Sequence, residues 1–318
     1  MYYDVFNGDA DGLCALHQLR LAEPRAATLL TGVKRDIALL RHVPPQAGLC
    51  IDVFDISLDS NIDALQALLA AGAKLRYFDH HSASHAPQHP ALHSFIDESP
   101  DVCSSLLVDR YLGGRYRPWA IAAAFGDNLT DIATRLATEA GLDPTQTAAL
   151  QQLGILLNYN AYGETVADLA IAPDVLYRAM QPYPSPFDFI AGAPQFAELA
   201  ACYSSDNARL GQLQPLAQQA HAAVYQLPAE KWARRISGIL ANRLTGDDPT
   251  KAYAILSSSA DGSLQVSVRA PKQGGKSAAE LCRQYPSGGG RVAAGGINRL
   301  PPEALDEFIQ RFFAWFAD

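Results

Sequence analysis

Features that would mark a secreted, membrane-spanning or disulfide-bonded protein are missing from this 318-residue sequence. The few cysteines are scattered and never in Cys-x-x-Cys spacing, so we expect reduced thiols rather than a disulfide framework or a zinc knuckle. No uninterrupted apolar run reaches about 18 residues, which argues against a membrane-spanning helix. The first residues show no basic stretch followed by an apolar one, so we expect no secretory signal and a cytoplasmic protein.

An excess of positive charge is also missing. The net charge is -8, which opposes a surface built to coat long duplex nucleic acid. The charge is unevenly spread, because residues 1–227 hold 13 Lys and Arg against 24 Asp and Glu, whereas residues 228–318 hold 12 against 9. We therefore expect metal ions to neutralise the acidic first part and the basic second part to hold a phosphate.

Hydrophobic residues make up 48% of the chain, enough for ordinary globular cores, and the length favours two domains. In the first third, short β-rich runs alternate with helical apolar spacing, which predicts β-α-β units and a mostly parallel sheet. Residues 100–175 and 193–227 have helical patterns. The expected strands of the first part are 2–6, 49–54 and 75–78, a hairpin is expected from 252–256 and 264–269, and a closing helix from 302–316.

Acidic clusters stand at the C-terminal ends of the three strands expected in the first part. They are Asp9-x-Asp11, Asp52 with Asp55 nearby, and Asp79-His80-His81. One such cluster alone is typical of a polar turn. The carboxyl ends of parallel strands meet at one crevice, however, so three clusters together predict a divalent-cation site. Carboxylates with imidazoles suit Mn²⁺ or Mg²⁺. Asp55 is a weaker candidate for an additional ligand.

A family resemblance is carried by motifs in a fixed order. Gly8-Asp9-Ala10-Asp11-Gly12, Asp52, Asp79-His80-His81 and Gly126-Asp127-Asn128 resemble the DHH phosphoesterase superfamily. The second half resembles its DHH-associated domain through Val266-Ser267-Val268-Arg269, Gly288-Gly289-Gly290 and Ala293-Ala294-Gly295. The likeness is greatest to the nanoRNase and oligoribonuclease-like branch and extends to RecJ-like exonucleases.

The resemblance implies an α/β fold with a parallel-sheet DHH domain and a smaller C-terminal α/β domain joined by a helical linker. The expected bounds are 1–192 for the metal-binding domain, 193–228 for the linker and 229–318 for the substrate-binding domain. It also implies two bound ions, Mn²⁺ in the first place with Mg²⁺ as the alternative.

The resemblance further implies a role for each matching residue. Metal ligands would be Asp9 for the first ion, Asp11, His80 and Asp127 for the second, and Asp52 bridging both. Asp52, His81 and Asp79 would serve catalysis, with His81 near the scissile phosphate and Asp79 orienting the histidines. Substrate contacts would come from Arg269, Gly288, Gly289, Gly290 and Arg291.

These residues predict a hydrolase that cleaves phosphodiester or phosphomonoester bonds of a short nucleotide or oligonucleotide through a two-metal-activated water. Two positions depart from the family pattern: no histidine precedes the first Asp-x-Asp, and Arg291 follows the glycine triplet where a histidine is usual. They keep open a catalytically weak nucleotide-binding or sensing protein, while RecJ-like single-strand exonuclease action ranks lower. We expect no membrane partner, and the aromatic closing helix is compatible with a homodimer.

Overall fold

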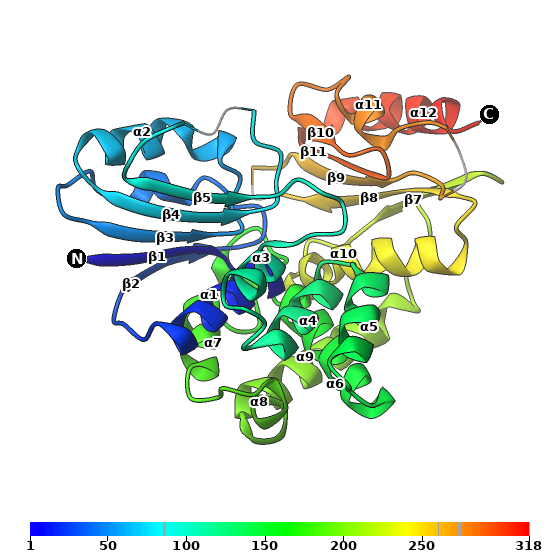
Figure 1. Cartoon of the computed structure of the whole chain (residues 1–318). Coiled ribbons are helices and arrows are strands. Elements are labelled where there is room, and N and C mark those ends of the chain that lie inside the picture. The colour runs from blue at the N-terminus through cyan, green and yellow to red at the C-terminus, as the bar shows by residue number, and fades with distance from the viewer. Residues whose placement is uncertain (85–86, 260, 273–274, 318) are drawn as a thin grey trace. The chain divides into compact units, whose positions relative to one another are not determined.

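The computed structural model describes residues 1–84, 87–259, 261–272 and 275–317. They form two compact units, Met1–Cys202 and Tyr203–Asp318. Each unit has its own β-sheet, with five strands in the first and six in the second (Figure 1). The predicted α/β class is therefore confirmed.

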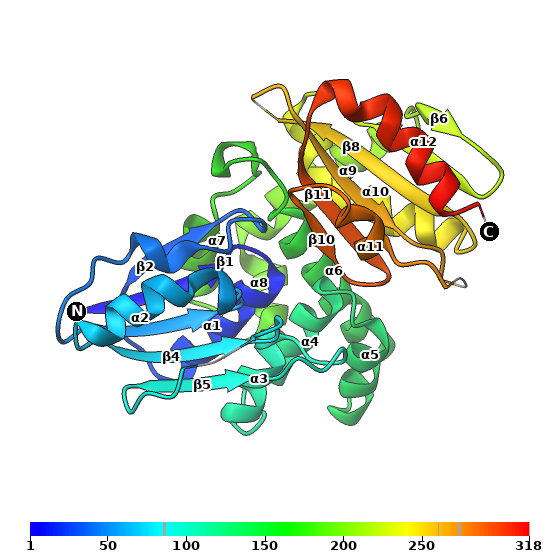
Figure 2. The ribbon, with the colours of Figure 1, turned by 90° about the horizontal axis from the view of Figure 1, so that it is seen from above.

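The first unit is a parallel sheet with helices on both faces. The strands lie in the order β2-β1-β3-β4-β5, and each neighbouring pair is parallel. Helix α2 (Ile62–Ala70) covers one face and α1 (Ala10–Ala22) lies against the other (Figures 1 and 2). The strands are Tyr2–Asn7 (β1), Thr28–Gly32 (β2), Cys50–Phe54 (β3), Lys74–Asp79 (β4) and Leu92–Ile96 (β5).

Alternation along the strands decides which side chains enter the core of this unit. Val53 and Tyr77 are paired across β3 and β4 and pack with the apolar face of α2. One position earlier, Asp52 and Arg76 are also paired. Because successive side chains of a strand point to opposite faces, these two charged residues lie on the side of α1.

Seven further helices complete the first unit or lead out of it. Helix α6 begins at a capping box: the Asp143 carboxylate accepts from the backbone N–H of Gln146, and the side-chain oxygen of Gln146 accepts from the backbone N–H of Asp143. The helices are α3 (Ser104–Tyr111), α4 (Arg117–Gly126), α5 (Thr130–Glu139), α6 (Pro144–Tyr159), α7 (Pro173–Met180), α8 (Pro186–Gly192) and α9 (Pro194–Leu210), with single 3₁₀ turns at 39–42, 59–61 and 166–168.

The second unit is a mixed sheet in the order β10-β11-β9-β8-β7-β6. Helices α11 and α12 cover one face and α10 the other (Figure 1). The aromatic side chains of α12 pack on that face with Val266 and Val268 of β9. The elements are β6 (Ala217–Gln218), β7 (Ala222–Gln226), α10 (Lys231–Asp247), β8 (Ala252–Ser258), β9 (Leu264–Arg269), α11 (Ala278–Cys282), β10 (Gly288–Gly290), β11 (Ala294–Leu300), a 3₁₀ turn at 302–304 and α12 (Leu305–Trp315).

Most of the expected elements are present, with two differences. The hairpin of β8 and β9, the closing helix and the three strands expected in the first part are confirmed. Strands β2 and β5 are not among the sequence-based predictions. The expected helical pattern over 193–227 is correct only as far as Leu210, because 217–218 and 222–226 are strands of the second sheet. The small apolar residues of β7 fill a buried strand as readily as a helix face.

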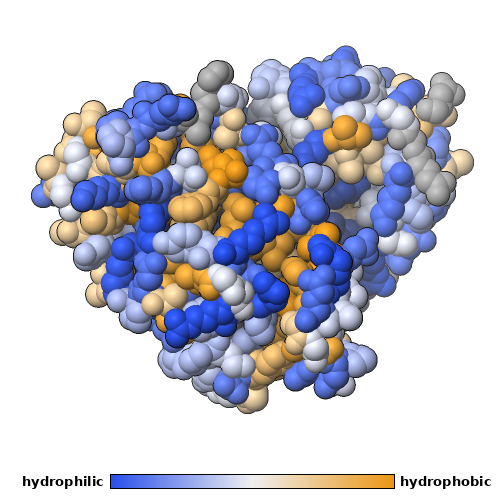
Figure 3. Space-filling model, viewed as in Figure 1, coloured by the Kyte–Doolittle hydropathy of each residue, from blue (hydrophilic) through white to orange (hydrophobic). Residues whose placement is uncertain are grey.

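No helix among the described residues is both long and apolar enough to cross a membrane. The two helices α9 and α10 are 17 residues each and carry charged side chains. The face of the molecule drawn in Figure 3 accordingly mixes hydrophilic with hydrophobic residues.

Burial of His17 predicts that acid destabilises the fold. Its Nε2–H donates to the carbonyl of Tyr183 at 3.0 Å, and its ring meets the edge of Trp119. Burial lowers the pKa of His17 from 6.5 to about 4. Below pH 6.5 the unfolded chain binds a proton that the folded chain does not, so this residue should remove about 3 kcal/mol of stability as the pH falls toward 4.

Denaturant unfolding between pH 7.5 and 4 measures this loss. His17→Gln keeps an N–H donor and should flatten the pH dependence, whereas His42→Gln, which alters an exposed histidine, should not. Identical slopes for the wild type and His17→Gln would contradict the prediction.

Candidate metal centre

The first acidic motif forms the turn between β1 and α1. The carboxylate of Asp9 caps the helix by accepting from the backbone N–H groups of Asp11 and Gly12, at 3.0 and 3.1 Å. The turn needs a glycine, since a Cβ on Gly8 would lie 2.2 Å from the carbonyl oxygen of Gly32. This close packing holds Asp9 and Asp11, both buried, at the carboxyl end of the sheet.

Asp11 connects the first motif with helix α3. Its two carboxylate oxygens accept from the backbone N–H groups of Ser104 and Ser105, at 2.7 Å each. The oxygen that bonds Ser104 also lies 3.9 Å from Nε2 of His80. One carboxylate therefore fixes the start of α3 and faces the third motif.

Asp55 follows β3 directly and has a left-handed backbone with φ of 56°. Its Oδ1 accepts from the Ser104 hydroxyl at 3.2 Å and lies 3.4 Å from His80 Nε2 and 3.9 Å from His81 Nδ1. Burial, together with the charges of neighbouring carboxylates, raises the pKa of Asp55 well above its usual range. A cation beside this carboxylate would relieve the repulsion.

The third motif ends β4 and carries two imidazoles. His81 donates from Nδ1 to Oδ1 of Asp79 at 2.7 Å, and the other carboxylate oxygen of Asp79 is buried with no hydrogen-bond partner in the described part of the chain. Burial works to lower the pKa of His81, but the bond to Asp79 and its charge outweigh burial and raise it. His81 is 34% exposed, whereas His80 is buried.

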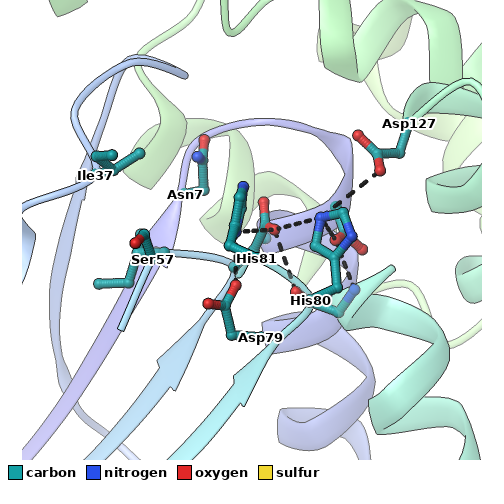
Figure 4. A network of polar contacts seen from close by, with 12 residues as sticks. Asn7, Ile37, Ser57, Asp79, His80, His81 and Asp127 are labelled. Carbon is teal, nitrogen blue, oxygen red and sulfur yellow. Dashed lines mark hydrogen bonds and ion pairs between the residues drawn. The ribbon is translucent and has the colours of Figure 1, made fainter. Parts of the chain in front are cut away.

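His80 lies between the acidic motifs and Asp127, which follows α4 (Figure 4). The distance from His80 Nε2 to Asp127 Oδ2 is 3.7 Å. Asp127 reaches this position because α4 and α6 pack closely: a Cβ on Gly154 would lie 2.0 Å from the carbonyl oxygen of Ala122. Burial raises the pKa of Asp127 despite the nearby ammonium of Lys34.

Lys34 belongs to the same cluster although no sequence motif indicated it. Its Nζ bonds Oδ2 of Asp9, lies 2.9 Å from Oδ1 of Asn158 and 3.9 Å from Oδ1 of Asp127. Burial alone would lower the pKa of Lys34, but the charge of Asp9 raises it well above its usual value. Burial alone would raise the pKa of Asp9, and the Lys34 ammonium outweighs it and lowers that pKa. Both groups are therefore charged at neutral pH.

Asp52 lies elsewhere, which corrects the assignment of this residue as the bridge between two ions. It stands in the middle of β3, and Asp55 is the first acid beyond the end of that strand. The Asp52 carboxylate pairs with Arg20, Arg25 and Arg76, the last through Nε at 2.7 Å. Burial would raise the pKa of Asp52, but these guanidinium groups lower it. Asp52 therefore joins β3 to α1 and β4, and Asp55 is the acid of this cluster that lies with His80 and His81.

Asp55, His80 and His81 form a candidate site for a divalent cation. Each offers a ligand atom, and these atoms lie within 4.8 Å of one another. A carboxylate with two imidazoles suits Mn²⁺ and is compatible with Mg²⁺. The unpaired buried oxygen of Asp79 and the raised pKa of Asp55 show that negative charge here is incompletely compensated. The residues present therefore fit such an ion.

The predicted substrate-binding residues lie together in the second unit. Arg269 ends β9 and is paired with Ala294 at the start of β11. The glycine triplet is the edge strand β10, paired with β11, and Arg291 begins the turn that joins them. An edge strand leaves part of its backbone N–H groups facing away from its neighbour. Two arginines and the glycine edge strand thus share one region of this sheet.

The comparison with protein families agrees with this placement. Residues 219–318 match the DHHA1 domain family. This part of the chain is a DHHA1 domain. The glycine triplet and both arginines fall inside it, as the resemblance of the second half implies. The sequence as a whole matches no curated protein at a significant level.

Solved structures of RecJ and of a phosphodiesterase share the fold of this chain. Exonuclease RecJ bound to manganese is 17% identical, with a TM-score of 0.65 over 99% of this chain and 90% of the other. RecJ of Thermus thermophilus in complex with Mn²⁺ is 18% identical with a TM-score of 0.67, and this chain spans about half (52%) of its length. The pGpG-specific phosphodiesterase PggH of Vibrio cholerae is 16% identical, with a TM-score of 0.62 over 100% of this chain and 99% of the other. The resemblance to DHH phosphoesterases is thus confirmed for the fold and for the DHHA1 domain.

Substitutions of Asp52 and Asp55, the two acids of the second acidic cluster, should affect different properties of the protein. Asp55→Asn removes a charged ligand and should weaken Mn²⁺ binding at least about tenfold, while the metal-free protein keeps its stability. Asp52→Asn leaves three guanidinium groups partly unpaired and should lower the free energy of unfolding by about 2 kcal/mol, with Mn²⁺ affinity unchanged.

Calorimetric Mn²⁺ titration and chemical unfolding of both variants separate these effects. Loss of Mn²⁺ affinity in Asp52→Asn with normal affinity in Asp55→Asn would restore Asp52 as the metal ligand.

Proposed function

We propose that this chain is a divalent-cation-dependent phosphoesterase that cleaves a phosphodiester or phosphomonoester bond of a short nucleotide or oligonucleotide. The observation that carries the proposal is the meeting of Asp55, His80 and His81 with Asp11 and Asp127 at the carboxyl end of the first sheet. Three separate strand ends and one helix end supply these groups, so the convergence is a property of the fold.

Asp55, His80 and His81 would hold the ion, for which Mn²⁺ is the first choice and Mg²⁺ the second. When bound, such an ion supplies Lewis acidity toward a phosphoryl oxygen and lowers the pKa of a water ligand toward neutrality. Two ions are implied by the family resemblance, and this number stays a prediction. An additional ion at Asp9 and Asp127 would meet the Lys34 ammonium.

His81 is the residue best suited to meet the reacting phosphate. Its side chain is partly exposed, whereas those of Asp55 and His80 are buried. The bond from its Nδ1 to Asp79 orients the ring. An imidazole that binds the ion is neutral, so His81 would hold the ion at the more exposed side of the site, where a phosphoryl oxygen could reach it. Asp79 would then act as a positioning residue.

The DHHA1 unit would recognise the nucleotide. Arg269 and Arg291 offer planar guanidinium groups, which bind phosphate with two parallel hydrogen bonds. The edge strand Gly288–Gly290 has no side chains that would keep a ligand away from its backbone. A balance of 12 Lys and Arg against 9 Asp and Glu over residues 228–318 supports a small anionic ligand.

The charge of the whole chain favours a short substrate over a long strand. A net charge of -8 gives little counterion release on a long polyanion. Among the similar structures, PggH is named for pGpG, a linear dinucleotide, and RecJ is named an exonuclease. We therefore place linear dinucleotides and short oligonucleotides first and RecJ-like degradation of long single strands lower.

A nucleotide-binding or sensing protein with slow hydrolysis is the second candidate. The position two before Asp9 holds Asn7, whose side-chain amide donates to the backbone carbonyl of Lys34 at 3.2 Å. This amide therefore holds the loop that contains Lys34. The histidine that is usual before the first Asp-x-Asp motif is missing. Arg291 stays charged at neutral pH and cannot donate a proton as a histidine would.

A product assay distinguishes these functions. Linear dinucleotides, longer single-stranded RNA and DNA, 3′-phosphoadenosine phosphate, cyclic dinucleotides and pyrophosphate are each incubated with Mn²⁺, Mg²⁺ or chelator. We expect Mn²⁺-dependent cleavage, fastest for linear dinucleotides and abolished by chelator. His81→Ala should lower kcat at least about a hundredfold, whereas His93→Ala, an exposed histidine of the same unit, should not.

Two results would contradict the proposal. Nucleotide binding without product would favour the sensing protein. Faster cleavage of long strands than of dinucleotides would favour the RecJ-like activity.

Gly289 tests the role of the DHHA1 unit. A Cβ at this position meets nothing within 4 Å, so Gly289→Ala should fold normally. If the backbone approaches the nucleotide closely, the added methyl should raise KM about tenfold with little change in kcat. Gly288→Ala is the structural comparison, because its Cβ would lie 1.7 Å from the carbonyl oxygen of Cys282 and should lower the Tm. An unchanged KM for a folded Gly289→Ala would exclude close contact at Gly289.

A further inference from the structure

Lys34 is held in place by contacts from several parts of the first unit. Its backbone N–H donates to the carbonyl of Ala161 at 2.9 Å, and its carbonyl accepts from the side chain of Asn7 at 3.2 Å. The side chain is 27% exposed and ends on Asp9 and Asn158. The backbone is thus tied both to the end of β1 and to the segment after α6, which leaves the ammonium a narrow choice of positions.

The ammonium of Lys34 lies between two acids that the family resemblance names as metal ligands. It pairs with Asp9 Oδ2 and is 3.9 Å from Asp127 Oδ1. The other carboxylate oxygen of Asp127 lies 3.7 Å from His80 Nε2. Asp127 therefore lies between the Lys34 ammonium and the His80 imidazole.

Charge compensation differs between Asp9 and Asp55. On the Asp9 side a full positive charge neutralises one carboxylate, and the Asn158 amide oxygen accepts a further N–H of the ammonium. Asp55 meets a hydroxyl, two imidazoles and the carboxylate of Asp9, with no full positive charge beside it among the described residues. The Asp55 side is therefore the one that an added cation would stabilise most.

We propose that Lys34 is a built-in cation that occupies the Asp9–Asp127 side, so that the protein binds one divalent ion tightly at Asp55, His80 and His81. A second ion would have to displace the Lys34 ammonium from Asp9. This inference deepens the proposed function and shares its metal centre. It concerns the number of ions bound, which can be measured without any substrate.

Mn²⁺ binding to the full-length chain tests the proposal. Free Mn²⁺ followed by electron paramagnetic resonance, together with calorimetry, should give one tightly bound ion per wild-type chain. Lys34→Met frees Asp9 and Asp127 and should bind a second ion at least about tenfold more tightly than the wild type does. Lys34→Gln should behave in the same way and tests the same point if the methionine variant does not fold.

Matched variants test whether loss of the Lys34 charge is what allows a second ion to bind. Lys34→Arg keeps the charge and should still bind one ion, as should Lys74→Met, which removes an exposed lysine at the start of β4. Adding Asp9→Asn to Lys34→Met should return the count to one. Circular dichroism and Tm confirm folding of each variant.

Two similar-affinity ions on the wild type, no ion at all, or a single ion on both folded Lys34→Met and Lys34→Gln would overturn the inference. Its failure is separable from failure of the proposed function. Ion counts as expected with no product from any substrate reject only the phosphoesterase, and cleavage by a wild-type chain that holds two tight ions rejects only the role of Lys34.

Discussion

The crowding of carboxylates at the carboxyl end of the first sheet is the constraint on which the candidate site depends. Asp9, Asp11, Asp55 and Asp79 are buried there, and negative charges close together in a poorly solvated region repel strongly. Backbone N–H groups hold the first two, and an imidazole N–H holds the fourth. The negative charge of Asp55 is compensated least among the four. A divalent cation would therefore be stabilised most beside this carboxylate.

The same sheet places acids in two different environments. Asp52 is surrounded by guanidinium groups from α1, the following loop and β4, so its charge is satisfied by the fold itself. Asp55, three positions further along the chain, lies beyond the strand among other acids and imidazoles. One carboxylate stabilises the packing of strands and helix, and the other lies in the candidate metal site. The surrounding charges, rather than the residue type, separate the two roles.

The DHHA1 unit carries positively charged side chains where the first unit carries carboxylates. Its arginines and its glycine edge strand come from neighbouring strands β9, β10 and β11 of the second sheet. Gly288 is required by the close carbonyl of Cys282, whereas Gly289 has open space around it. Packing therefore explains the first glycine and does not require the second.

The sequence by itself determined the alternation of strands and helices, the order of the acidic motifs and the DHHA1 resemblance, because local periodicity and short motifs carry that information. It could not decide between Asp52 and Asp55, since that choice depends on where β3 ends and which face each side chain meets. It also gave no sign of Lys34, which reaches Asp9 from the segment after β2 only once the chain has folded. Contacts between residues distant in the chain set these positions, so only the tertiary structure decides which charges are neutralised and which remain for chemistry.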